Sequence, residues 1–443
     1  MSTPVDRLRE LIRIPTVSRS NAEEVDWAAF DAFRATLAEL FPLVHERLES
    51  ELVGGASLLF RWAGKDAAAA PLVLMAHQDV VPADEPGWQF PAFEAELVRD
   101  EDGEERIRGR GAIDDKGALG SILEAVESLL AEDFTPAADV YLAFGHDEEV
   151  AGNGAPAIVD LLEARGVRPA LVVDEGGAVV EGIFPGVEAP IAVVGVSEKG
   201  LAGIELSVER SGGHASTPVR DGATTRLARA IVRLDRSPAP AQLAEPTAEM
   251  IRRLGAHTKQ PMRFLFTHVG LFRGLLTAVF SRLGPETNAM VRTTYAVTRL
   301  RGSAGDNVIA EKATAMVNVR IAVGSSLAEA LAHIQQVVAR DGVEARLVYG
   351  AEPSPVSPSE GEAWDRLSAS IGALFPEAIV TPYVMLQASD GRHFTRVSDH
   401  VYRFLPFDLT TAERATLHAI DESIRVSTYL RGIEFFRDLL ARS

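Results

Sequence analysis

Residues 1–195 alternate short, continuous apolar runs with segments of helical periodicity. The apolar runs are PLVLMA (71–76), VYLAFG (140–145) and ALVVD (170–174). Runs of this length without polar interruptions are typical of strands that are buried on both faces of a sheet. We therefore expect three strands of a largely parallel sheet, joined by helices.

The segments between these runs predict the covering helices. After Gly117, apolar residues recur at spacings of three, four and seven, namely at Leu119, Ile122, Leu123, Val126, Leu129 and Leu130. This spacing forms one apolar face of a helix. A second helix is expected at 155–165, with Gly166 where helices commonly end in a left-handed residue. The order strand, helix, strand, helix, strand predicts an α/β domain whose mainly parallel sheet is flanked by helices.

From residue 196 onward the periodicity changes. Apolar and polar residues alternate in GIELSVE (203–209), TTYAVTRL (293–300) and TAMVNVRI (314–321). Strict alternation is typical of antiparallel strands with one open face. Together with a helix expected at 223–235, these strands predict an inserted α+β domain at 196–322.

Helical patterns return after the inserted domain. Ser326 and Glu329 form a capping box at the start of one helix, and a terminal helix is expected at 427–441. We assign 1–195 and 323–443 to one catalytic domain.

Residues 236–291 give no clear prediction. Within this segment 264–283 is strongly apolar, but it contains His268, Arg273 and Arg282. Charged residues are costly in a membrane span, so a core helix or a wall facing the substrate is favoured over a span.

Composition narrows the classes of function. A chain of 443 residues with 47% hydrophobic content is long enough for two cores. Its net charge of −19 argues against nucleic-acid and membrane partners. The start of the chain lacks a secretory pattern, so a cytoplasmic location is expected. Because the chain has no cysteine, any metal must be held by histidine and carboxylate.

Potential metal ligands follow the first two predicted strands. His77 and Asp79 are two residues apart, so that in an extended backbone both side chains point to one side and Asp79 can orient the imidazole. Glu148 and Glu149 end the next strand, where one carboxylate can bind a cation and the other can act as a base. A surface pair and a solvated acidic loop are the alternatives for each motif alone.

Two further acidic pairs lie at the same predicted edge. Asp114 and Asp115 precede the first helix, where aspartates are often only N-caps, and Asp174 and Glu175 end the third strand. Converging carboxylates repel one another strongly unless a cation compensates them. The joint pattern therefore favours a metal site, with zinc, cobalt or manganese as the ions that suit histidine and carboxylate together.

The motifs resemble those of the metallopeptidase family that includes aminoacylase, carboxypeptidase S and carnosinase. They occur in the family's order, and the branch of carboxypeptidase S is the most similar. The motifs are HQDVVP (77–82), GRGAIDDKG (109–117), HDEEVAGNGA (146–155), VDEGG (173–177), GGHASTP (212–218), SDGRHF (389–394) and TLHAIDES (416–423).

This resemblance implies a site for two divalent ions, most simply zinc. It makes Asp114 the bridge between the ions, with His77 and Glu175 on one and Glu149 and His418 on the other. Family members differ in which acidic residue of the VDEGG loop binds, so Asp174 is the alternative to Glu175.

The resemblance also implies catalytic and substrate-binding roles. Asp79 would orient His77, Glu148 would be the general base, and His214 would stabilise the oxyanion, often across a dimer interface. The positions that would contact the substrate are Asn307, Arg320 and Arg392, with His393 a further candidate and a structural ion pair the alternative for the last two.

Three positions depart from the family's pattern. Ala151, Ala310 and Ala92 stand where the family often has glycine, proline and proline, respectively. None of them removes a ligand or the base, so the departures bear on substrate preference.

These observations predict a two-metal hydrolase that cleaves the amide bond of dipeptides or N-acyl amino acids next to a free carboxylate. A deacylase of a biosynthetic N-succinyl or N-acetyl diamino acid is the alternative within the same fold. A non-catalytic metal-binding protein is the alternative from another class. The expected partners are the small substrate and a second copy, as a homodimer through the inserted domain.

Overall fold

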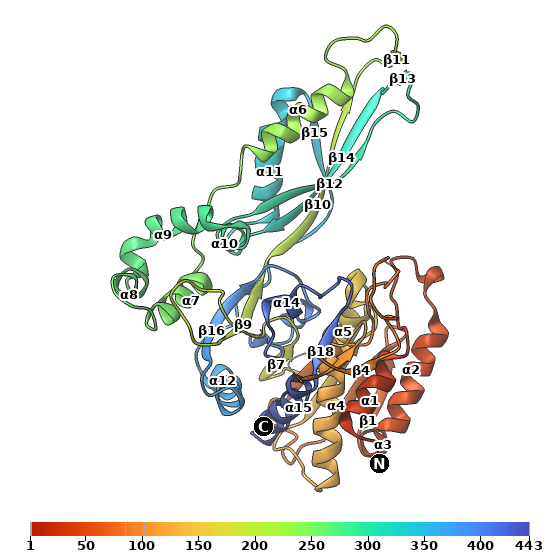
Figure 1. The fold of residues 1–443 in the computed structure, drawn as a ribbon, viewed down its shortest axis with the longest axis vertical. Coiled ribbons are helices and arrows are strands. Elements are labelled where there is room, and N and C mark those ends of the chain that lie inside the picture. Colours follow the sequence, from red (N-terminus) through yellow and green to blue (C-terminus); the bar gives the residue numbers. More distant parts are fainter. Residues whose placement is uncertain (1, 85, 101–102, 443) are drawn as a thin grey trace. The chain divides into compact units, whose positions relative to one another are not determined.

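The structure is a computed structural model, which describes residues 2–84, 86–100 and 103–442. The chain forms two compact units, and each is described by itself. The first unit comprises Met1–Val196, Ser357–Tyr383 and Ser389–Ser443, and the second comprises Ser197–Val356 and Val384–Ala388. Figure 1 shows both units and labels many of their elements.

A large mixed sheet forms the centre of the first unit. Among the described residues it has nine strands in the order β1-β2-β6-β3-β7-β17-β9-β16, with β8 paired to β9. Their bounds are β1 (Glu49–Val53), β2 (Ser57–Trp62), β3 (Leu72–His77), β6 (Val140–Gly145), β7 (Leu171–Asp174), β8 (Val179–Val180), β9 (Ile191–Glu198), β16 (Ile379–Met385) and β17 (Val401–Arg403).

The centre of this sheet is parallel and confirms the predicted fold class. Strand β3 pairs in parallel with both β6 and β7, and β7 pairs in parallel with β17. The three expected apolar runs are β3, β6 and β7, and all their residues are buried. The outer pairs β1–β2, β2–β6, β17–β9 and β8–β9 are antiparallel.

Helices cover both faces of the sheet. Helix α4 contacts α1, α3, α15 and β3, while α5 and α13 pack with alternate sheet residues such as Val73 and Met75 in a separate buried cluster. The helices of the first unit are α1 (Pro4–Ile12), α2 (Trp27–Leu40), α3 (Pro42–Arg47), α4 (Lys116–Ala131), α5 (Gly154–Ala164), α12 (Glu362–Leu374), α13 (Gly391–Phe394), α14 (Thr411–Arg414) and α15 (Val426–Ala441), with short 3-10 turns at Ala22–Glu24 and Glu148–Val150.

The expected helices of this unit are observed with small shifts of their ends. Helices α4, α5 and α15 occupy the segments predicted after Gly117, at 155–165 and at 427–441. Gly166 has a φ of 70°, the left-handed conformation expected at the end of α5.

A small antiparallel sheet joins two distant segments of the first unit. Its order is β18-β5-β4, with bounds β4 (Glu96–Arg99), β5 (Glu105–Arg108) and β18 (Ser423–Arg425). Ser423 pairs with Arg108, so the loop that contains His418 lies beside the loop that contains Asp114.

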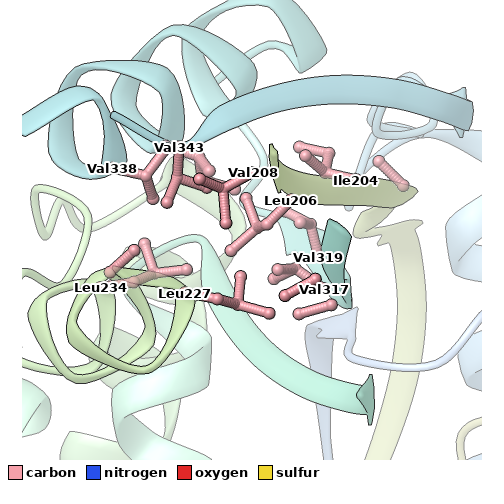
Figure 2. Close-up of a cluster of buried hydrophobic side chains, with 14 of the residues drawn as sticks. Ile204, Leu206, Val208, Leu227, Leu234, Val317, Val319, Val338 and Val343 are labelled. Atoms are coloured by element: carbon pink, nitrogen blue, oxygen red, sulfur yellow. The ribbon is translucent and has the colours of Figure 1, made fainter. Parts of the chain in front are cut away.

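The second unit is built on an antiparallel sheet with one covered face. Its order is β12-β14-β10-β15, and helices α6 and α11 pack against it. Figure 2 shows the core, in which Leu206, Leu227, Val317 and Val338 meet. The bounds are β10 (Gly200–Glu209), β12 (Thr294–Arg301), β14 (Lys312–Ile321), β15 (Glu344–Ala351), α6 (Ala223–Asp235) and α11 (Leu327–Val338), with a 3-10 turn at Ala339–Asp341.

The second unit extends beyond the predicted end of the inserted domain. We expected the chain to return to the first domain at 323, but the second unit continues to Val356. The reason is that β15 pairs with β10 along its length, and α11 supplies Ile334 and Val338 to the same core. Helix α11 does begin with the expected capping box of Ser326 and Glu329.

The segment without a clear prediction, 236–291, is mostly helical. It contains α7 (Glu245–Gly255), α8 (Met262–Thr267), α9 (Val269–Leu283) and α10 (Pro285–Met290). The expected core helix at 264–283 is only partly buried, since Leu271 and Leu283 are largely exposed. Among the described helices, none has the length and apolar content needed to cross a membrane.

Candidate metal centre

Four segments of the first unit bring histidine and carboxylate side chains together. His77 is the last residue of β3, Glu149 lies in the turn after β6, and Glu175 follows β7. Asp114 precedes α4. Because the carboxyl ends of parallel strands meet at one edge of a sheet, these positions converge there.

Asp114 is the centre of this group. Its Oδ1 lies 3.0 Å from His77 Nε2, and its Oδ2 lies 3.0 Å from His418 Nε2. One carboxylate therefore faces two imidazoles through its two different oxygens. This is the arrangement required of a bridging ligand.

The side chains around Asp114 form two potential ligand sets. His77, Asp114 and Glu175 form one, and Asp114, Glu149 and His418 form the other, with the ligand atoms of each set within 4.8 Å of one another. His77 Nε2 lies 3.6 Å from Glu175 Oε1, and His418 Nε2 lies 3.0 Å from Glu149 Oε2.

The donor set fits a pair of divalent ions. It offers imidazole nitrogen and carboxylate oxygen without sulfur, a combination that suits zinc, cobalt and manganese. The buried Oε1 of Glu149 has no hydrogen-bond partner among the described residues. Such an unsatisfied acceptor needs a cation or another donor.

Asp79 links His77 to the turn that contains Glu148. Its Oδ1 lies 3.3 Å from His77 Nδ1, and its main-chain oxygen lies 2.9 Å from the same nitrogen. The main-chain N–H groups of Glu148 and Glu149 donate to the two oxygens of its carboxylate at 3.2 and 3.1 Å. Asp79 thus contacts the two strand ends at once.

The geometry distinguishes the two acidic residues at the end of β7, Asp174 and Glu175. The carboxylate of Asp174 accepts the main-chain N–H of Gly391 at 2.6 Å and is engaged with α13. Glu175 instead belongs to the first ligand set. Of the two alternatives, only Glu175 lies in a potential ligand set among the described residues.

Asp115 is at the N-cap position of α4 but does not cap the helix with its side chain, which makes no capping hydrogen bond among the described residues. Its Oδ2 accepts the main-chain N–H of His77 at 3.1 Å instead. Asp115 therefore fixes the end of β3 relative to the start of α4.

The titration of the cluster reflects burial and close charges. Burial raises the pKa of Glu148 well above its usual range, and the nearby carboxylates of Asp390, Glu149 and Asp114 raise it further. The hydrogen bond to Asp114, followed by that to Glu149, raises the pKa of His418 to about 10. Burial alone would lower the pKa of His77, but its bonds to Asp114 and Asp79 raise it well above its usual range.

Glu422 is a buried contact of the site that the sequence analysis missed. It accepts the main-chain N–H groups of Ile113 at 2.8 Å and Asp114 at 3.2 Å through Oε1, and that of Gly111 at 3.0 Å through Oε2. The fully buried Arg110 donates to Oε2 at 2.8 Å. The signal was present in TLHAIDES, but nothing local distinguishes Glu422 from the neighbouring Asp421.

The same contacts fix the loop of His418. Arg110 also donates to the main-chain oxygen of Ala419 at 2.9 Å. His418 adopts a left-handed backbone with φ of 58°, which is costly for a residue with a side chain and persists only when its surroundings hold it. Arg110 and Glu422, which we call the buried clamp, thereby tie the Asp114 loop to the His418 loop.

The remaining candidate residues of the sequence analysis lie in other segments. His214 is exposed in the short pair of β11 (Gly213–His214) with β13 (Val308–Ile309), and Asn307 immediately precedes β13. Arg320 lies on β14, and Arg392 and His393 lie in α13 of the first unit. His214, Asn307 and Arg320 belong to the second unit.

His214 has a defined tautomer. The main-chain N–H of Ser216 donates to its Nδ1 at 3.2 Å, and the Ser216 hydroxyl lies 2.7 Å from the same nitrogen. Because Nδ1 accepts a hydrogen bond, the ring proton of the neutral imidazole is on Nε2. The outer nitrogen of His214 is therefore a donor.

Lys199 is a second cation near Arg320. Its Nζ donates to the main-chain oxygens of Ala289 at 3.0 Å and Arg292 at 2.8 Å. Burial, with a further contribution from Arg320, lowers the pKa of Lys199 to about 7. Lys199 is therefore about half protonated near neutral pH, and an anion bound beside Lys199 and Arg320 would favour its charged form.

Comparison with known proteins identifies relatives over nearly the whole chain. The family model described as "Peptidase family M20/M25/M40" matches residues 73–442. The N-fatty-acyl-amino acid synthase/hydrolase PM20D1 of Mus musculus is 36% identical over 98% of this chain and 86% of the relative. The probable carboxypeptidase S-like 2 of Dictyostelium discoideum is 34% identical over 98% of this chain and 84% of the relative.

Solved structures share the fold. The M20 family metallo-carboxypeptidase Sso-CP2 from Sulfolobus solfataricus has a TM-score of 0.69 at 17% identity and covers 100% of this chain and 99% of its own. Human carnosine dipeptidase 1 has a TM-score of 0.67 at 15% identity and covers 99% and 95%, respectively.

Proposed function

The chain belongs to the peptidase family M20/M25/M40 and is a metal-dependent peptidase or amidohydrolase, and we propose from this premise that it hydrolyses N-acyl amino acids and dipeptides. The bond cleaved is the amide next to an amino acid with a free carboxylate. The observation that carries the proposal is Asp114, whose two oxygens each lie 3.0 Å from a different histidine.

The proposed metal ligands are the two sets that share Asp114. His77 and Glu175 would hold one ion with it, and Glu149 and His418 the other; zinc is the proposed ion. A pair of such ions supplies Lewis acidity and lowers the pKa of bound water.

Glu148 is proposed as the general base. It lies beside the ligand Glu149, and its main-chain N–H is fixed by Asp79. Glu148 would take a proton from the attacking water and return it to the leaving nitrogen of the amide. Asp79, through its contact with His77 Nδ1, would keep the Nε2 of His77 directed at the site.

The residues of the second unit are proposed to bind the substrate. The Nε2–H of His214 is suited to donate to the oxyanion of the tetrahedral intermediate. Arg320 supports recognition of the free carboxylate, because Lys199 lies near it and adds positive charge. We further propose that Asn307 and Arg392 contact the substrate. The chain is also proposed to form a homodimer through the second unit.

The relatives support an apolar acyl group as the preferred substrate class. One is named an N-fatty-acyl-amino acid synthase/hydrolase, and others are named carboxypeptidase S-like. A panel of N-dodecanoyl phenylalanine, N-acetyl phenylalanine, a Leu-Phe dipeptide and N-succinyl diaminopimelate tests this preference. Turnover of only the last compound would favour a biosynthetic deacylase instead.

The variant Glu148→Gln tests the mechanism. It should retain two zinc ions per chain by elemental analysis, and its turnover should fall by about 10²–10⁴, the usual contribution of a general base. Glu188→Gln, at an exposed position, is the matched control and should keep full activity. Wild-type turnover in Glu148→Gln would remove the base assignment, and turnover that survives full removal of metal by a chelator would remove the metal mechanism.

A further inference from the structure

One segment of the second unit has a charge opposite to that of the chain. Residues 250–285, which we call the basic segment, contain no acidic residue, although the whole chain has a net charge of −19. The segment has six basic residues: Arg252, Arg253, Lys259, Arg263, Arg273 and Arg282. The local potential over these helices is therefore positive.

Three of the basic side chains are available to a partner. Arg252 and Arg253 pair with Glu249, and Arg273 donates to the main-chain oxygen of Leu243. Lys259, Arg263 and Arg282 are exposed, and no described carboxylate forms an ion pair with them. Arg282 donates only to the oxygen of Ala278 in its own helix, among the bonds found for the described residues.

Helix α9 has two apolar faces. One contains Val269, Leu276 and Phe280 and is buried in the second unit. The other is exposed and repeats at every fourth residue, with Leu271 75%, Leu275 53% and Leu283 58% exposed. We call this second face, with Val279 and with Phe264 of α8, the outer stripe.

Exposed apolar side chains in a row indicate an interaction surface. A monomer seldom leaves such a row in water, because burial of each leucine side chain is favourable. Arg263 and Arg282 are on the same two helices as the outer stripe, and Lys259 lies in the turn that precedes α8. A helix with leucine and phenylalanine on one side and basic residues beside them is suited to lie in the plane of a lipid interface.

We propose that the outer stripe and the basic segment bind the surface of an anionic phospholipid bilayer. Leu271, Leu275 and Phe264 enter the boundary between headgroups and acyl chains. Lys259, Arg263 and Arg282 contact the phosphates. The helix lies in the interface and does not cross it, in keeping with its 15 residues.

The combination of positive charge and apolar side chains favours a lipid bilayer over a second copy of the chain or a nucleic acid as the partner of this surface. In a two-fold contact between copies of this chain the same patch faces itself, which would bring the basic side chains of both copies together. A nucleic acid satisfies the cations but leaves the aliphatic stripe without a partner, because bases stack on aromatic rings and not on leucine. An anionic bilayer satisfies both features.

This surface goes beyond the proposed hydrolysis. If the substrates are N-acyl amino acids with long apolar chains, they partition into the same interface, so binding there raises their local concentration. That consequence rests on the proposed function, whereas lipid binding itself does not. The two can therefore fail separately.

Flotation of the full chain with lipid vesicles tests the proposal. We expect binding to vesicles of phosphatidylcholine mixed with phosphatidylglycerol, and weak binding to phosphatidylcholine alone or at high salt. Arg263→Gln with Arg282→Gln should weaken binding about 25-fold, since each basic residue near an anionic surface contributes about fivefold. Leu271→Ser with Leu275→Ser should weaken it about tenfold or more.

Matched controls come from the same unit. Leu300 on β12 is 66% exposed, and Arg340 is exposed after α11; Leu300→Ser and Arg340→Gln should leave binding unchanged. Thermal unfolding checks that every variant is folded. Failure to float with anionic vesicles overturns the proposal. Wild-type binding to vesicles by the Leu271→Ser, Leu275→Ser variant would also overturn it. Two further results would assign the surface to another partner and overturn the proposal: the chain self-associates through these leucines and does not bind lipid, or it binds single-stranded DNA but not vesicles.

Discussion

Asp114 and its two histidines make metal binding a competition with protons. In the metal-free protein, hydrogen bonds to Asp114 and Glu149 raise the pKa of His418 to about 10, and the pKa of His77 is also raised well above its usual range. The imidazole of His418 is therefore protonated near neutral pH. Zinc needs the neutral ring, so zinc binding must release this proton.

The first prediction concerns pH. Zinc affinity should rise with pH up to about 10, with release of the proton of His418 on binding, measured by calorimetry in buffers of different ionisation enthalpy. His45→Gln, distant in sequence from every proposed ligand, is the control. A zinc affinity that does not change with pH would contradict the protonated state of His418 in the metal-free protein.

The same shift has a consequence for stability. A histidine whose folded pKa is raised stabilises the fold below its unfolded pKa of 6.5, and this contribution is lost as pH rises toward about 10. The metal-free protein should thus lose stability over this range relative to His418→Gln, as measured by urea unfolding. With zinc bound the imidazole of His418 is neutral, so the loss of stability with rising pH should disappear in the wild-type protein.

The second prediction concerns the buried clamp of Arg110 and Glu422. Glu422→Ala leaves Arg110 buried without its carboxylate, which should cost about 3–5 kcal/mol in the free energy of unfolding. It also releases the main-chain N–H groups of Ile113 and Asp114, so zinc affinity should fall about 10–100-fold.

A double variant separates these two effects. Arg110→Met with Glu422→Met removes the unpaired charge, so part of the stability should return, while the main-chain N–H groups of the Asp114 loop stay without their acceptor and zinc affinity stays low. Urea unfolding and zinc titration measure the two quantities. Full recovery of zinc affinity in the double variant would refute a positioning role for the clamp.

At the level of elements, the sequence predicted those helices and strands whose local pattern of apolar residues determines them. Helix α4 and strands β3, β6 and β7 were expected because long periodic or continuous apolar patterns allow few other structures. The antiparallel strands β1, β2 and β9 at the margins of the sheet were not expected. Strands β1 and β2 pair as a local hairpin, but the pairing of β2 with β6 and of β9 with β17 depends on residues far along the chain, which no short pattern records.

The candidate site could likewise be predicted only where its residues adjoin predicted strands or helices. His77, Asp114, Glu149 and Glu175 follow predicted strands or precede a predicted helix, so the topology alone brings them to one edge. His418 lies in an irregular loop and was identified only by its resemblance to the family's motif. Glu422 was missed, because its partners lie more than 300 residues away in the sequence and its own neighbourhood gives no sign of burial.

The third prediction concerns the start of α4. A Cβ on Gly117 would lie 2.3 Å from the main-chain oxygen of Ala112, and a main-chain atom cannot move without shifting the loop that contains Asp114. Gly117→Ala should therefore lower zinc affinity although alanine favours a helix. Elemental analysis after dialysis against weak chelator measures this.

A helix glycine without close neighbours provides the control. A Cβ on Gly372 in α12 has no atom within 4 Å among the described residues. Gly372→Ala should keep zinc affinity and stabilise the fold by about 0.5–1 kcal/mol. Equal zinc affinity in both variants would show that the close approach at Gly117 does not position Asp114.

At the scale of the whole molecule, the net charge does not show how basic and acidic residues are distributed over the surface, and this distribution determines which partners can bind. The net charge of −19 led us to expect no membrane partner. Residues 250–285 nevertheless contain six basic and no acidic residues, in helices whose exposed side is apolar. Electrostatic attraction acts over about 10 Å at moderate ionic strength, so a local surface can bind what the average repels.

The division into two units gives the last prediction. Every proposed metal ligand and the proposed base belong to the first unit, whereas His214, Asn307 and Arg320 belong to the second. The main-chain N–H of Ser357 donates to the oxygen of Val196 at 2.8 Å, so the two ends of the first unit are adjacent. A short glycine-serine linker can therefore replace residues 197–356.

This truncated chain should bind zinc with the wild-type stoichiometry and yet lose hydrolysis, because metal binding and substrate binding reside in separate units. His214→Ala in the full chain isolates one part of that loss, which should be about 10²–10³ in turnover for a single oxyanion donor. If the truncated chain still hydrolyses substrate at the full rate, the roles proposed for His214 and Arg320 fail. If it instead loses its zinc, the first unit is not sufficient to form the metal centre.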